Sequence, residues 1–249
     1  MRAAAGRTVG LPSVVAAELD KLRTLPVTVL AVAGTAVVGA LIAAAQAAAA
    51  ADHDLPVGAV DVTLRTVPFV VAGLVLVGVL AVSQEHAGRQ VATTLAAVPR
   101  RGLLVVGKTI AATGVVALTA TVTLGACLAA AAVTQRLLDA SVVTDGAGAG
   151  PLLGAVAYLV LIGVLAHAVA LVARHLVPSL VGVLALVLVV SPLLAGATEL
   201  ARWLPDRAAT AWFDAGPSTL EGPTATIVAL AWVVVVGGAG SWRFVARDA

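Results

Sequence analysis

The chain has 249 residues, of which 61% are hydrophobic and only 11% are charged. Soluble domains carry about 25% charged residues, so this composition excludes an ordinary soluble domain and predicts a membrane protein. The net charge of +2 gives no sign of a nucleic-acid partner, and we expect none.

Six apolar runs are long enough to cross a bilayer, since a spanning helix needs about 20 mostly apolar residues. They lie at about 26–50, 67–83, 103–134, 152–173, 176–197 and 224–241. The runs are too long and too uniform for the alternating pattern of a membrane barrel. We therefore predict an all-α membrane protein, with residues 1–249 forming one domain of six transmembrane helices.

The placement of charge predicts the orientation. An even number of spans puts both termini on one side, and that side carries 11 of the 15 basic residues. They are Arg2, Arg7, Lys21, Arg23, Arg89, Arg100, Arg101, Lys108, Arg174, Arg243 and Arg247. The positive-inside rule therefore predicts cytoplasmic N- and C-termini. No cleavable signal peptide is expected, because the first apolar run has full membrane length.

Residues 11–25 precede the first run and have amphipathic spacing. Val15, Leu19 and Leu22 share one helical face at positions i, i+4 and i+7. The charged residues of this segment are Glu18, Asp20, Lys21 and Arg23. We predict a helix that lies along the cytoplasmic leaflet before the chain enters the membrane at Pro26.

The segment between the second and third runs, residues 84–101, predicts another short amphipathic helix. From Glu85 onward, apolar residues recur at spacings of four, four and three and define one face. Pro99 ends this helix because it has no N–H to donate. The polar residues Glu85, Arg89, Gln90 and Thr93 lie elsewhere on its surface. Amphipathicity alone fits a helix that binds a partner and one that only anchors the chain equally well.

The start of the third run contains a possible nucleotide-binding motif. Residues 102–109 satisfy the pattern G-x-x-x-x-G-K-[ST], but a phosphate loop follows a β-strand, whereas this segment continues into an apolar run. We interpret the match as accidental and Lys108 as an interfacial charge that arginine could replace. Farther along the run, we expect Gly114 and Gly125 to allow close approach of a neighbouring helix.

Only a few of the polar residues are candidates for a catalytic or metal site. His167 lies inside the fourth run, where it could bind a proton or substrate. With no acid nearby in sequence, packing between helices is the favoured interpretation. Asp52, His53 and Asp54 are adjacent, so they cannot converge on one ion without ligands from elsewhere, and we predict a solvated loop. We assign no catalytic residue and no metal ligand.

The segment between the last two runs mixes apolar and charged residues. It contains Trp203, Leu204 and Pro205, followed by Trp212 and Phe213. Tryptophan is enriched at membrane interfaces. The segment is therefore either an interfacial belt or a set of short helices that partly re-enter the membrane.

Three of these patterns together resemble type-2 ABC transporter permeases. Glu18, Lys21, Leu22 and Arg23 resemble the E-x-x-K-L-R elbow of that family before its first span. The segment after the second run resembles the family's coupling helix and the Pro-x-Arg corner that follows it. The matching residues are Glu85, Gly88, Leu95, Pro99, Arg101 and Lys108. The W-L-P sequence at 203–205 is similar to the family's partly re-entrant outer loop. The resemblance covers nearly the whole chain.

The resemblance implies a function and a set of partners. The chain would be the permease subunit of an ABC exporter in a bacterial plasma membrane, moving an amphipathic, lipid-like, drug or peptide cargo. A second permease, the same or related, and two cytosolic ATPase subunits would complete the assembly, with ATP and Mg bound by the ATPases and no cofactor in this chain. The coupling contacts would be Glu85, Arg89, Gln90, Thr93 and Arg101. The alternative is an ion-coupled secondary transporter or channel, which paired intramembrane acids would favour.

Overall fold

A computed structural model describes residues 10–87, 101–140, 148–214, 216 and 219–247. Within these ranges every regular element is helical and no strand occurs, which confirms the predicted all-α class. The elements are α1 (Leu11–Thr24), α2 (Pro26–Asp52), α3 (Ala59–Ala87), α5 (Arg101–Leu137), α6 (Gly150–Ala173), α7 (Leu176–Ala185), the π-helical η1 (Leu186–Val190), α8 (Ser191–Ala197), the 3-10 helix η2 (Glu199–Trp203), α9 (Pro205–Thr210) and α10 (Gly222–Arg247).

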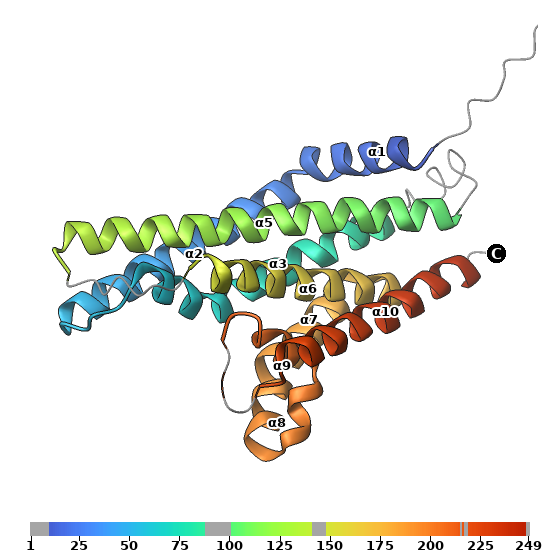
Figure 1. Ribbon diagram of the computed structural model, residues 1–249. Helices are drawn as coiled ribbons and strands as arrows, with labels where there is room; N and C mark the ends of the chain where they lie inside the picture. The colour runs from blue at the N-terminus through green and yellow to red at the C-terminus, as the bar shows by residue number, and fades with distance from the viewer. Residues whose placement is uncertain (1–9, 88–100, 141–147, 215, 217–218, 248–249) are drawn as a thin grey trace, which may run out of the picture.

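Six of the described helical segments are long and apolar enough to cross a membrane, as the sequence predicted. They are Pro26–Asp52, Ala59–Ser83, Gly102–Leu137, Gly150–Ala173, Leu176–Ala197 and Gly222–Arg243. The fifth combines α7, η1 and α8 into one apolar stretch. Helix α1, the start of α5 and the end of α10 lie at the same end of the bundle (Figure 1). Which side of the membrane this end faces stays a prediction.

The second spanning helix begins at Ala59, not at Val67 as the apolar run predicted. The hydroxyls of Thr63 and Thr66 donate to carbonyl oxygens one turn earlier in the helix, at 2.8 and 2.9 Å. Val62, 2% exposed, packs with buried residues of α2 and α5. Helix α3 thus extends beyond the continuous apolar run. Its polar side chains bond within the helix, and Val62 packs against the neighbouring helices.

Helices α3 and α6 form the centre of the fold. In their most apolar stretches 72% and 67% of residues are buried, against 17% for the fifth and sixth spans. Helix α6 packs against α3, α5 and α10, while α3 also packs against α2 and α7. Figure 1 shows α3 and α6 between α5 and α10. The last two spans therefore leave most of their apolar surface for lipid or another chain.

Glycines set how closely the central helices approach, but they are not the ones expected. A Cβ on Gly78 of α3 would overlap the carbonyl oxygen of Gly163 on α6, so the two backbones touch. In contrast, a Cβ on Gly114 or Gly125 would meet no described atom within 4 Å. No described helix of this chain approaches those two glycines, because both lie on the exposed face of α5.

Candidate functional site: the α1–α5 ion pair and the segment between the last two spans

A buried ion pair joins α1 to α5. The Nζ atom of Lys108 donates to Oε2 of Glu18 at 2.9 Å, and the two side chains are only 2% and 7% exposed. The interpretation of Lys108 as an interfacial charge was therefore wrong. An arginine in this enclosed place would have to fit a larger, planar group, so the two cations are not interchangeable here.

The local sequence explains why these two charges meet. Helix α1 buries Val14, Glu18 and Leu22, which recur every fourth residue, so the buried face is rotated from the one predicted through Val15 and Leu19. On α5, Gly107 leaves room for this face. A Cβ at position 107 would lie 2.6 Å from Cγ1 of Val14. The close approach at Gly107 thus places the next residue, Lys108, against Glu18.

The ion pair is expected to matter most when one of its two charges is removed. Removing two charges from water costs several kcal/mol per ion, and their attraction repays this only with good geometry. Removing one partner of a buried pair is far more costly, because it strands the other charge. We therefore expect that keeping both charges paired favours the arrangement in which α1 lies across the start of α5.

Residues 102–109 do not have the conformation of a phosphate loop. All eight lie inside α5, where backbone N–H groups are directed along the helix and cannot wrap a phosphate. Gly107 packs against α1, Lys108 binds Glu18, and the hydroxyl of Thr109 lies 3.4 Å from Nε2 of His167. Each of these three residues contacts another helix, so they serve packing within the bundle.

His167 is 1% exposed and lies between α6 and α5. Its Nδ1 atom has no hydrogen-bond partner in the described part of the chain. The backbone of Gly78 on α3 lies near the ring. This burial agrees with the interpretation of a histidine packed between helices.

The predicted coupling residues are only partly covered by the structure. Arg89, Gln90 and Thr93 lie outside the described residues. Glu85 does not begin a separate helix, because α3 continues to Ala87, and Arg101 is the first residue of α5. The apolar run ends at Ser83, so the sequence gave no signal that α3 continues to Ala87.

The three residues predicted to form an elbow, Glu18, Lys21 and Arg23, differ in burial. Residues 11–24 form the predicted helix, within which Glu18 is buried and Lys21 is half-buried. Arg23 lies 3.7 Å from Asp20 with both side chains more than 70% exposed. An exposed pair of this kind contributes little to stability, so Glu18 is the one of these three residues that is buried in the packing of α1.

Trp203, Leu204 and Pro205 form the corner between η2 and α9. The carbonyl oxygen of Trp203 accepts a 2.9 Å hydrogen bond from Nε1 of Trp232 on α10. Leu204 is extended, and Pro205, which has no N–H to leave unsatisfied, opens α9 at its first position. The corner is thus fixed to the last span.

The following residues pack against two spanning helices. Nε1 of Trp212 donates to Oγ1 of Thr226 at 3.0 Å, and its carbonyl lies where a Cβ on Gly154 would be. The ring of Phe213 meets Tyr158 edge-on, with centroids 5.3 Å apart. The segment therefore packs against α6 and α10, which fits both an interfacial belt and a partly re-entrant segment. Its depth in the membrane stays a prediction.

Asp206 is the buried acid of this segment. It is 4% exposed, and its Oδ1 atom has no hydrogen-bond partner within the described ranges. Nε of Arg207 lies 3.9 Å from Oδ2 and donates to Oγ of Ser191 at 3.0 Å. Burial raises the pKa of Asp206 above its usual value, and a hydrogen bond with Ser191 and the charge of Arg207 only partly oppose this.

The raised pKa predicts a specific pH dependence of stability. In the pH window between the unfolded pKa of about 4 and the higher folded value, the folded chain binds more protons. Stability should therefore rise as pH falls through that window and level off below about pH 4. Asp206→Asn should remove this contribution, measured as the unfolding midpoint in detergent across the window. The exposed Asp214→Asn is the control, and parallel curves for wild type and Asp206→Asn would contradict the prediction.

Comparisons with known proteins do not identify a family for this chain. No protein-family model matches it, and no curated protein matches it at a significant level. A functional proposal therefore depends on the residues and contacts described above.

Proposed function

We propose that the chain is the membrane-spanning permease subunit of a type-2 ABC exporter. The observation that carries the proposal is the Glu18–Lys108 ion pair, which joins the elbow-like α1 to the start of α5. Helix α5 directly follows residues 84–101, the segment that resembles a coupling helix. The proposal thus joins two described parts, α1 and the start of α5, to a segment that adjoins α5 in sequence.

This arrangement suggests how movement would pass into the membrane. Lys108 lies seven residues after Arg101, which is two turns or about 10 Å along a helix. A displacement of the coupling segment would move the start of α5 as a rigid rod. The buried ion pair would carry α1 with it, and α1 leads directly into the first span at Pro26.

The remaining surface suits a subunit of a larger membrane assembly. The last two spans are mostly unburied and expose large apolar side chains such as Leu193 and Val234. A second permease and lipid would cover them, enclosing an aliphatic path for an amphipathic cargo. ATP and Mg would bind to the two ATPase subunits. The first test is purification of the tagged chain from its native membrane, and absence of an ABC ATPase from that preparation would contradict the proposal.

Arg89→Glu tests the coupling segment itself. The change removes the i,i+4 pair with Glu85 that the sequence predicts, at a cost of only about 0.5 kcal/mol, so membrane insertion should survive. Docking of the ATPase should weaken, because a reversed charge at an interface opposes association. The measurements are co-purification of the ATPase and cargo-stimulated hydrolysis in proteoliposomes.

The matched control is Arg136→Glu, an exposed arginine at the opposite end of α5. It should leave both measurements unchanged. If Arg89→Glu retains its ATPase as well as wild type, and changes at Gln90 and Thr93 do the same, residues 85–98 do not form the coupling contact.

A further inference from the structure

Two hydrogen bonds hold η2 and α9 beside the spanning helices and not beyond their ends. The carbonyl oxygen of Trp203 accepts from Trp232, which lies about 15 Å along the span that begins at Gly222. Nε of Arg207 donates to Oγ of Ser191, about 9 Å before the fifth span ends. The segment is thus fixed at a level well inside the ends of the fifth and sixth spans.

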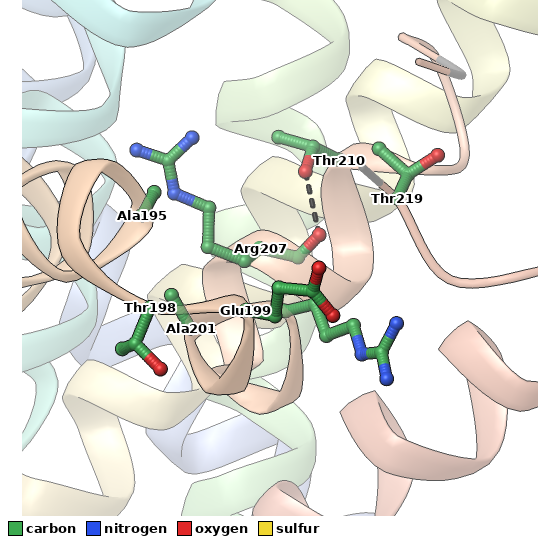
Figure 2. Close-up of a pocket in the computed structure, with 8 residues that line it drawn as sticks. Ala195, Thr198, Glu199, Ala201, Arg207, Thr210 and Thr219 are labelled. Carbon is green, nitrogen blue, oxygen red and sulfur yellow. Dashed lines mark hydrogen bonds between the residues drawn. The ribbon is translucent and has the colours of Figure 1, made fainter. Parts of the chain in front are cut away.

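A polar cavity of about 370 Å³ lies within this segment. Figure 2 shows its lining side chains, which come from α8, η2, α9 and the residues before α10. The side chains of Glu199 and Arg202 are exposed, and the cavity has room for several water molecules. The complete polar lining consists of Thr198, Glu199, Arg202, Arg207, Thr210 and Thr219.

Hydrocarbon cannot solvate this lining. Contact between a charged side chain and lipid is costly, so charged residues at membrane depth face the protein interior or a water-filled cavity. Thr198 and Leu204, which flank η2, are extended, and non-helical backbone at membrane depth obeys the same condition. Among the described residues the protein does not enclose the segment, because every residue of η2 except Ala201 is exposed. Water is therefore the medium that satisfies both the charges and the backbone.

We propose that the cavity is a water-filled vestibule that enters the membrane from the end of the bundle opposite α1 and reaches the level of Trp203. That end is where α10 begins, and Thr219 of the lining lies shortly before it (Figure 1). Water there solvates Glu199 and Arg202. Because the lining combines threonine hydroxyls with charges of both signs, it favours water and small hydrophilic solutes over lipid chains. The inference depends on the membrane assignment and not on an ATPase partner.

The test measures how fast single cysteines react with an impermeant, positively charged methanethiosulfonate reagent, added to intact cells and, separately, to inside-out vesicles. The background variant is Cys127→Ala, because the chain has one cysteine. Thr210→Cys, in the lining, should react on the side that modifies Arg136→Cys at the end of α5. Leu230→Cys on α10 is 54% exposed but lies outside the cavity. It should react at least about tenfold more slowly, because a thiol in apolar surroundings forms little of the reactive thiolate.

A second matched pair lies on α8. Ala195 lines the cavity, whereas Leu193 on the same helix is 69% exposed and lies outside the lining. Ala195→Cys should react from the same side as Arg136→Cys, and Leu193→Cys at least about tenfold more slowly.

Three outcomes would overturn the proposal. Equal rates within both pairs would show that water surrounds the whole segment. Reaction of Thr210→Cys from the side opposite to that of Arg136→Cys would place the opening at the wrong end of the bundle. If Thr210→Cys and Ala195→Cys react only after solubilisation in detergent, or not at all, lipid or a second copy of the chain fills the cavity in the membrane.

Discussion

Glu18→Ala should destabilise the folded chain by about 3–5 kcal/mol, because it removes the carboxylate that neutralises the buried Lys108. The 2.9 Å contact is nearly closed to solvent, so water cannot replace the lost partner without opening the α1–α5 interface. The measurement is the thermal unfolding midpoint of the purified chain in detergent. Asp20→Ala, which removes the exposed partner of Arg23, should change stability by no more than about 0.5 kcal/mol.

A double variant separates the loss of the pair from damage to α1. In Glu18→Met with Lys108→Met, both charges are removed, and apolar residues of similar length take their place. Much of the stability lost in Glu18→Ala should return. A double variant as unstable as the less stable of the two single Met variants would show that these side chains do not act as a pair.

The number of spanning helices could be predicted because lipid imposes a strict condition. A backbone in a bilayer must satisfy its hydrogen bonds internally, so each long apolar run had to be a helix. Where polar residues flank a run, this condition no longer identifies the boundary. Residues 59–66 were missed for that reason: Asp61 and Arg65 suggest a loop, yet their neighbours pack against α2 and α5.

The ion pair could not be predicted as a pair, although each residue gave a signal. Glu18 is one helical turn from both Val14 and Leu22, so it lies on an apolar face. Lys108 lies inside an apolar run and not at its edge. Both facts indicate buried charge, and buried charges are usually paired. The two residues are 90 positions apart, and between them lie two spans whose packing a single sequence does not specify.

The segment between the last two spans shows the same limit. Trp203 and Trp212 could be predicted to lie near an interface from their residue type alone, which stays a prediction. Their partners on α6 and α10 depend on how the helices cross. That crossing depends on small residues, and a glycine signals close approach only if it lies on an inward face. Gly78 and Gly163 do, whereas Gly114 and Gly125 do not.

Gly78→Ala should strongly impair folding, because its new methyl group would overlap the backbone of Gly163. A backbone carbonyl cannot move aside as the end of a flexible side chain can, so α3 and α6 must separate along their contact. These are the two most buried spans, and the separation would disturb the centre of the bundle. Overpacking of this kind costs about 1–3 kcal/mol or more. The expected result is a lower unfolding midpoint and less monodisperse protein after extraction into detergent.

Gly125→Ala is the matched control, because it adds the same methyl group in the middle of another spanning helix, where nothing lies within 4 Å. Alanine favours a helix over glycine by about 1 kcal/mol, and both variants receive this gain. The difference between them therefore isolates the contact with Gly163. Gly125→Ala should match or exceed wild-type stability, while Gly78→Ala falls below it. If the two variants have the same midpoint, α3 and α6 do not touch at this crossing.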